Sequence, residues 1–186
     1  MSTLKELRVT THDFHERLHD HPMLSTLITR NLTRNDYLWV LFSFERFYEA
    51  LGGQIDFELI QEKLSLIRQD TDFLASNDRP LPQCTYFKNE YDHNHALGVK
   101  YVIIGSALGG SLISKNIEKQ LKLKPGNGNS YFGSSPDTAR RYWKNYQVTL
   151  EKECTNIQTC SKAALNTFEM LEKWLWDVYA LKKKRV

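Results

Sequence analysis

One apolar stretch in the middle of the chain carries three closely spaced glycines. It reads Tyr101-Val102-Ile103-Ile104-Gly105-Ser106-Ala107-Leu108-Gly109-Gly110. The apolar residues predict a helix, but each glycine inside a helix costs about 0.5–1 kcal/mol relative to alanine. Three glycines so close together indicate that something flat or bulky approaches the helix backbone. We therefore expect one long helix over residues 95–121, broken at this point.

A second stretch, near the N-terminus, is polar, compatible with a helix and rich in histidine. It reads Thr11-His12-Asp13-Phe14-His15-Glu16-Arg17-Leu18-His19. His15 and His19 are one helical turn apart and share a face. A metal-ligating histidine on this helix could hold a planar haem. The haem would lie between this helix and the facing one, where the glycines leave space beside the backbone. Ordinary surface histidines explain the cluster equally well.

The remainder of the chain also carries helix signals, and no segment has the pattern of a strand, a repeat or a linker. Thr3 and Glu6 match a capping box that opens a helix through about His19, and Ser135 precedes Pro136 as in a helix N-terminus. Helices are further expected over 37–51, 55–75, from 136 onward and over 162–181, with loops at 76–84 and 124–129. We predict an all-α fold, a single-domain bundle of six or seven helices spanning residues 1–186.

Length and composition are those of an ordinary globular domain. The 186 residues are 41% hydrophobic, and a net charge of +3 is too small to predict a nucleic-acid partner. No stretch approaches about 18 consecutive apolar residues, so no membrane span is expected. The three cysteines are an odd number without metal-site spacing, and no apolar signal segment opens the chain. These features favour a reducing compartment, and we expect a cytoplasmic protein.

The histidines and carboxylates also allow a second interpretation, a di-metal oxidase site. Helical bundles of that kind use two Glu-x-x-His motifs and two further carboxylates. The matching residues are Glu16 with His19, Glu90 with His93, and the candidate carboxylates Glu45, Glu49 and Glu58. Two such motifs can arise by chance in a histidine-rich chain, so this interpretation stays an alternative.

Residues 4–19 and 95–114 resemble the biliverdin-producing haem oxygenases, most closely the soluble bacterial type associated with bilin-binding photoreceptors. Three motifs occur in the family's order: Thr11 four residues before His15, the Tyr48-Glu49-Ala50-Leu51 run, and Gly105, Gly109 and Gly110 as Gly-x-x-x-Gly-Gly. The resemblance implies a haem held between a proximal N-terminal helix and a glycine-broken distal helix.

The resemblance also implies roles for residues that would bind haem. His15 would be the axial ligand of the haem iron. Arg8 would contact a propionate, with Lys100 or Tyr101 as a further contact. Arg140 and Lys144 share one helix face and would form the second set of propionate contacts, although an ordinary solvated face is the alternative for both.

On the distal side, the family's glycines let the backbone approach the macrocycle and leave room for dioxygen. Gly105 and Gly109 would do this here with Gly110, and Ser106 would help to organise the waters that deliver protons. Phe168 would pack on the haem, with simple core packing as an equal alternative.

Three positions depart from the family pattern. His19 stands where the family has a glutamate that accepts the second ring N–H of the proximal histidine, and a neutral His19 could accept it instead. Ile104 stands where bacterial relatives have glutamate. Ser106 replaces the aspartate of the animal-type branch and agrees with the bacterial one.

The activity that the resemblance implies is oxidative cleavage of haem to biliverdin, with release of iron and carbon monoxide. Haem would be substrate and cofactor, and molecular oxygen the co-substrate. The chain has no flavin or nicotinamide motif, so an external reductant is expected, either a ferredoxin- or flavin-type protein or a small molecule. A non-catalytic haem-binding or haem-storage protein is the first alternative, favoured by His19 and Ile104, and a di-metal oxidase is the second.

Overall fold

The fold was analysed in a computed structural model that describes residues 2–52, 58–74, 81–85, 92–133 and 135–185. Its helices are α1 (Thr3–Asp20), α2 (Pro22–Ser25), η1 (Thr26–Ile28), α3 (Arg34–Gly52), α4 (Glu58–Phe73), α5 (His93–Ser106), η2 (Ala107–Gly109), α6 (Gly110–Leu121), α7 (Pro136–Glu153) and α8 (Ile157–Lys184). Within the described ranges, extended pairing is limited to isolated bridges at 124–128. The all-α prediction is confirmed.

Side-chain caps fix where the first long helices begin. The predicted capping box at Thr3 is displaced by one residue, because Ser2 is the N-cap and its Oγ accepts a hydrogen bond from the Lys5 N–H at 3.3 Å. Before α3, Thr33 Oγ1 accepts from the Asp36 N–H at 3.1 Å, and the Asp36 carboxylate accepts from the Thr33 N–H at 3.2 Å. This reciprocal pair satisfies two N–H groups that the helix itself leaves free.

The later helices differ from expectation mainly at their ends. The last helix was expected from residue 162, but Asn156 caps it by accepting from the Thr159 N–H, so α8 starts at Ile157. Ser135 and Pro136 open α7 as predicted, although the Ser135 side chain makes no capping hydrogen bond. Residues 55–57, 75 and 76–80 of the predicted helix and loop lie outside the described residues.

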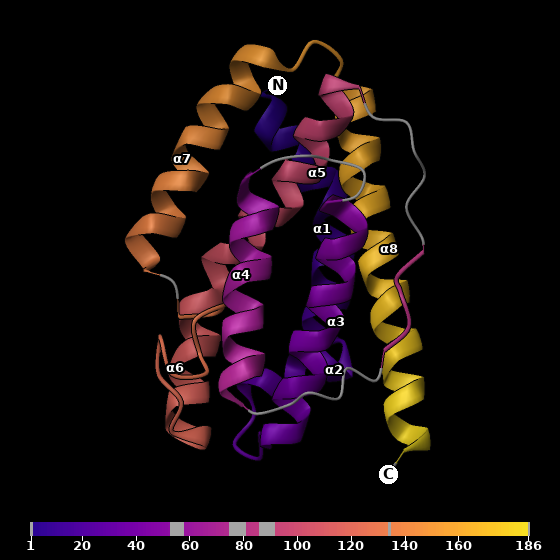
Figure 1. The fold of residues 1–186 in the computed structure, drawn as a ribbon. Coiled ribbons are helices and arrows are strands. Elements are labelled where there is room, and N and C mark those ends of the chain that lie inside the picture. The colour runs from indigo at the N-terminus through magenta and orange to yellow at the C-terminus, as the bar shows by residue number, and fades with distance from the viewer. Residues whose placement is uncertain (1, 53–57, 75–80, 86–91, 134, 186) are drawn as a thin grey trace.

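The helices form a bundle with α8 running along one side of it (Figure 1). α8 packs against α1, α3 and α5, while α3 packs against α4 and α5 against α7. The crossing of α5 and α8 is close at Gly98, where an added Cβ would lie 2.1 Å from the Cys160 carbonyl oxygen. The core between these helices is rich in aromatic residues from α3, among them Tyr37, Phe47 and Tyr48.

The predicted broken helix is observed as α5, η2 and α6, with the change to a 3₁₀ turn at Ala107–Gly109. By length and composition this segment, His93–Leu121, could cross a membrane. A helix in a protein core has the same character, and here Leu97, Val102 and Ile103 are buried within the bundle. Packing against α7 and α8 accounts for the apolar residues of α5, whereas Leu108 and Leu112 further along the segment are exposed.

Candidate functional site

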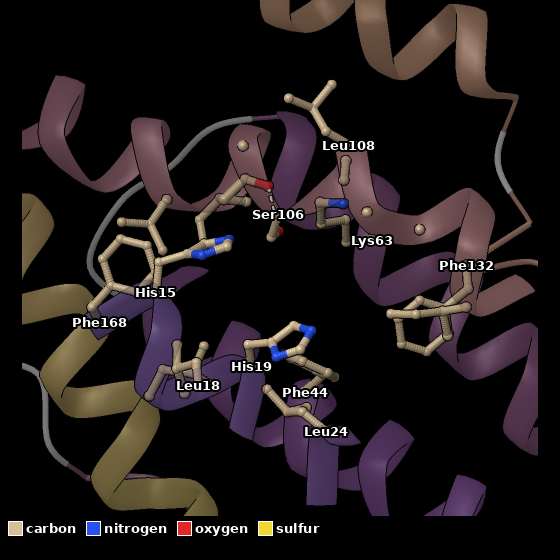
Figure 2. Close-up of a pocket in the computed structure, with 18 of the residues that line it drawn as sticks. His15, Leu18, His19, Leu24, Phe44, Lys63, Ser106, Leu108, Phe132 and Phe168 are labelled. Carbon is tan, nitrogen blue, oxygen red and sulfur yellow. Dashed lines mark hydrogen bonds between the residues drawn. The ribbon is translucent and has the colours of Figure 1, made fainter. Parts of the chain in front are cut away.

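A cavity of about 520 Å³ lies between α1 and the α5–η2–α6 segment. Figure 2 shows His15 and His19 projecting into it from α1, with Ser106 and Leu108 on the opposite side. We call the α1 side the proximal wall. The distal wall is the opposite side, formed by residues 105–110 together with side chains from α3, α4 and the loop after α6. The volume lies in the range of about 300–1,000 Å³ that is usual for cofactor sites.

The proximal wall presents an imidazole whose two nitrogens have different surroundings. His15 Nδ1 lies 3.4 Å from Glu16 Oε1, which leaves Nε2 as the nitrogen available to a metal. His19 Nδ1 lies 3.2 Å from Asp20 Oδ1, so the expected hydrogen bond between the two imidazoles is not formed. In this structure Glu16, not His19, is the acceptor beside the candidate ligand.

Thr11, one turn before His15, ties the proximal helix to the distal one. It is buried, and its Oγ1 donates to the Leu7 carbonyl at 2.7 Å and lies 3.4 Å from the Tyr101 hydroxyl. Because Tyr101 belongs to α5, this contact links the two helices beside the cavity.

The three distal glycines have three different surroundings. An added Cβ at Gly109 would meet no atom within 4 Å, so this position faces open space. At Gly110 it would lie 3.2 Å from the Phe132 carbonyl oxygen, and at Gly105 it would lie 3.4 Å from the Trp143 ring. Gly109 therefore keeps space open at the cavity, whereas Gly110 allows close backbone packing. The 3₁₀ turn that contains Gly109 is the kind of break often found at functional positions.

Three hydroxyl groups lie near the distal glycines, those of the exposed Ser106 and of the buried Tyr48 and Tyr131. Ser106 Oγ donates to the Ile103 carbonyl at 2.9 Å, and the Tyr48 and Tyr131 hydroxyls are 2.8 Å apart. Burial raises the pKa of Tyr48 to about 12, with the Tyr131 and Ser106 hydroxyls opposing the rise. Burial also raises the pKa of Tyr131 well above its usual value. Both phenols are therefore neutral hydrogen-bonding groups near pH 7.

Comparison with known proteins identifies the family. Residues 56–177, more than half of the chain, match the family model described as heme oxygenase. This chain belongs to the haem oxygenase family. Its fold is also similar to the solved structure of the NO- and CO-bound heme oxygenase from Neisseria meningitidis, with a TM-score of 0.74 and 20% identity over 97% of this chain and 93% of that one. No curated protein sequence matches the chain.

Set against the haem oxygenase pattern, most of the predicted site residues line the cavity. They are Arg8, His15, Tyr101, Gly105, Ser106, Gly109, Gly110 and Phe168. Arg140 and Lys144 do not line it, and Arg140 is instead exposed and paired with Asp137 at 3.2 Å. The residue of α7 that does reach the cavity is Trp143. The shared face of Arg140 and Lys144 therefore points away from the cavity wall.

The residues of the di-metal interpretation do not come together. The described residues contain no group of three or more His, Cys, Asp or Glu side chains that could hold a metal ion. Glu45 and Glu49 instead bind Arg68, at 3.1 Å and 2.9 Å. Glu90 lies outside the described residues.

Asp70 is a residue of the site that the sequence analysis missed. It is fully buried on α4 and accepts hydrogen bonds from the backbone N–H groups of Ser130 at 2.7 Å and Tyr131 at 2.8 Å. These bonds hold the loop that places Tyr131 and Phe132 on the cavity wall. The available signal was an acidic residue one turn after Ile67 on an otherwise apolar helix face.

Lys63, also on α4, was missed in the same way. Its side chain is buried, lines the cavity and places Nζ 5.4 Å from the centroid of the Tyr131 ring. Burial lowers the pKa of Lys63 to about 8, and the neighbouring Glu62 opposes this change. A buried lysine is rare enough that its position is a functional signal.

Proposed function

We propose that this haem oxygenase family member cleaves haem oxidatively to biliverdin, releasing iron and carbon monoxide. The observation that carries the proposal is that His15 and Gly109 line one cavity, the first on its proximal wall and the second on its distal wall. An imidazole can ligate the iron on one face of the macrocycle, and the open space at Gly109 leaves the other face accessible.

The residues around the cavity fit haem. Its lining is largely apolar, with Leu18, Phe44 and Phe168 available to pack on the ring and exclude water. Arg8 and Tyr101 can bind the anionic propionates. Bound haem would supply both the iron that activates dioxygen and the ring that is cleaved.

The chain's own groups would orient that chemistry. Glu16 can accept the Nδ1–H of His15, which would hold the imidazole in one tautomer and make it a more basic ligand. Ser106 can hold a proton at its Oγ on the distal wall. We further propose that electrons come from a separate reductant, either a ferredoxin- or flavin-type protein or a small molecule.

Two broader assignments belong to the same proposal. Residues 1–186 would act as one domain, since buried residues of all the long helices belong to one core. The protein would be cytoplasmic, because Cys84, Cys154 and Cys160 are all free thiols.

One observation favours the alternative, a haem-binding protein without turnover. None of the described residues that line the cavity is an aspartate or glutamate, and the Ser106 hydroxyl is directed to a backbone carbonyl. A distal wall without a carboxylate has fewer ways to deliver protons.

Haemin titration followed by reduction in air tests the proposal. We expect a bound-haem absorption spectrum and then conversion to a bilin, identified by chromatography. His15→Ala should abolish the ligated-haem spectrum, whereas His12→Ala, an exposed histidine of the same helix, should retain it. Stable haem binding without bilin would establish the binding alternative. Loss of ligation in His12→Ala but not in His15→Ala would refute the assignment of the ligand.

A further inference from the structure

The distal wall contains hydroxyl groups that are poor acids and one amine that is not bound to a carboxylate. The Ser106 hydroxyl donates to a carbonyl, and the Tyr48 and Tyr131 phenols are buried against one another. Lys63 is the remaining polar side chain on this wall among the described residues, and none of the described carboxylates forms an ion pair with its Nζ. Figure 2 shows it on the same side of the cavity as Ser106.

A second, smaller cavity lies directly behind Lys63. It has a volume of about 30 Å³ and is bounded by side chains of α4, α5 and α7. Lys63, Ala107 and Tyr131 line both cavities, so these residues lie between the two spaces. A space of this size has room for a water molecule, which needs roughly 10–15 Å³. Its lining is largely apolar, and the Lys63, Tyr131 and Tyr142 side chains could hold such a water by hydrogen bonds.

The outer side of the second cavity reaches the protein surface. Glu62 and Tyr142 line it, both are exposed, and the Tyr142 hydroxyl donates to Glu62 Oε2 at 3.5 Å. A carboxylate, a water-sized space and the Lys63 amine thus follow one another from the surface to the distal wall. Each group in this series can accept a proton and donate one.

We propose that Lys63 is a proton-relay residue, which transfers protons from the surface at Glu62 and Tyr142 to the distal side of the haem cavity. The proposal rests on the proposed function, because haem cleavage consumes protons at that side. In each transfer an Nζ–H bond breaks as a water in the main cavity takes the proton. The neutral amine then takes a proton from water in the second cavity, and the hydroxide left there is reprotonated from solvent at Glu62 and Tyr142. The ammonium is thereby restored and no electron moves.

The electrostatic surroundings suit this role. Burial lowers the pKa of Lys63 to about 8, so ammonium and amine are both accessible near neutral pH. The charged and titratable groups around the two cavities are Arg8, His15 and His19 from α1, Tyr48 from α3, Glu62 from α4, Tyr101 from α5, Tyr131, and Tyr142 from α7. Lys63 is therefore one of several charged or titratable groups around the cavities, and the assignment needs a direct measurement on Lys63 itself.

That measurement uses the haem-free protein. NMR of the lysine side chains, with the Lys63 signal assigned from its absence in Lys63→Met, should show a pKa near 8, well below the ordinary lysine value of about 10.4. A Lys63 signal that titrates at the ordinary value would overturn the proposal without reference to catalysis.

The rate of bilin formation then shows whether Lys63 acts as a relay or has a structural role. Lys63→Met keeps an unbranched side chain, one atom shorter, that carries no transferable proton. Lys63→Arg keeps the charge but cannot release a proton near neutral pH. Both variants should bind haemin as the wild type does. Both should form bilin at least about tenfold more slowly and lose the limb of the pH–rate profile near pH 8. Added methylammonium should partly restore Lys63→Met, and Lys119→Met, an exposed lysine of α6, should match the wild type.

The outcomes distinguish the two proposals. If the wild type forms bilin and Lys63→Met keeps its rate and pH profile, the relay is refuted and the proposed function stands. If Lys63→Arg restores the wild-type profile, charge alone matters and the relay is refuted. If the wild type binds haem and forms no bilin, the proposed function fails, and the relay fails with it.

Discussion

The proximal wall of the cavity comes from a single helix, whereas the distal wall is assembled from α3, α4, the η2 turn and the loop after α6. On α1 the candidate ligand and its neighbours contact one another locally, as His15 does with Glu16. On the distal wall Tyr48 meets Tyr131, and Asp70 meets the backbone of Ser130, across long stretches of sequence. The two walls should therefore respond differently to substitution.

The two walls differ in whether the residues that form the site also stabilise the fold. His15 and His19 are exposed, so changing either should affect binding and leave folding intact. On the distal side Tyr48, Asp70 and Tyr131 are buried and hydrogen-bonded, so each of them serves the fold and the site together.

Asp70→Ala should have the largest effect, and it should act on the distal wall through stability. Two buried N–H groups, of Ser130 and Tyr131, would lose a charged acceptor. We expect the free energy of unfolding to fall by about 2–4 kcal/mol, measured by urea denaturation. Gln69→Ala, at an exposed position of the same helix, should stay within about 0.5 kcal/mol of the wild type. Equal stability of the two variants would show that aromatic packing alone holds the loop.

Two glycines of the broken helix should separate packing from cavity space. Gly98→Ala places a Cβ against the Cys160 backbone and should destabilise the protein by about 1–3 kcal/mol. Gly109→Leu meets open space at its Cβ, so the free energy of unfolding should change by less than about 1 kcal/mol.

The reverse order is expected for haem binding. Gly109→Leu should weaken haemin affinity at least about tenfold, about 1.4 kcal/mol, because the side chain would enter the cavity. Haemin titration and urea unfolding of both variants give the two free energies. Wild-type affinity in Gly109→Leu would mean that the glycine serves the turn and not the space beside it.

The same contrast explains what could be predicted from the sequence. The proximal helix was predictable because its signals are local: a capping motif within one residue of its start, and histidines one turn apart on one face. The broken distal helix was predictable because glycine is costly there. Lys63 and Asp70 were missed because helix periodicity shows that a polar residue interrupts an apolar face, but not what that residue meets in space.

The α7 residues show the same limit of prediction from sequence. Spacing places Arg140 and Lys144 on one face of a helix, but spacing does not say which face turns inward. The buried residues Ala139, Tyr146 and Leu150 set that face, and it brings Trp143 to the cavity. Tertiary packing therefore turns these two cations, which the resemblance and their spacing had placed at the rim, toward solvent.

A pH-dependent contribution to stability is expected at the end of the proximal helix. His21 is buried beside Trp176, and its Nδ1 accepts from the Met23 N–H at 3.2 Å. Burial lowers its pKa, so the folded protein binds this proton less readily than the unfolded chain, whose value is about 6.5. The stability is therefore complete above about pH 6.5 and is lost progressively as the pH falls from there to the lower folded value.

Urea unfolding between about pH 5 and pH 7.5 measures this contribution. His21→Asn keeps a capping acceptor and cannot titrate, so its stability should fall less on acidification than that of the wild type. His12→Asn, exposed on the same helix, should follow the wild type. Parallel curves for His21→Asn and the wild type would assign the acid sensitivity to other groups.

The smallest effect is expected at the rim, where Arg8 and Arg140 form a matched pair. Arg8 lines the cavity, whereas Arg140 is exposed and bound to Asp137. Because an exposed ion pair contributes about 0–1 kcal/mol, Arg8→Gln should weaken haemin binding by up to about fivefold. Arg140→Gln should leave the affinity unchanged. Raising the salt concentration should reduce the difference between wild type and Arg8→Gln, since screening weakens a propionate contact that solvent can reach. If Arg140→Gln instead gave the larger loss, α7 would have to rotate toward the haem on binding, and the distal wall would be less preformed than its hydrogen bonds indicate.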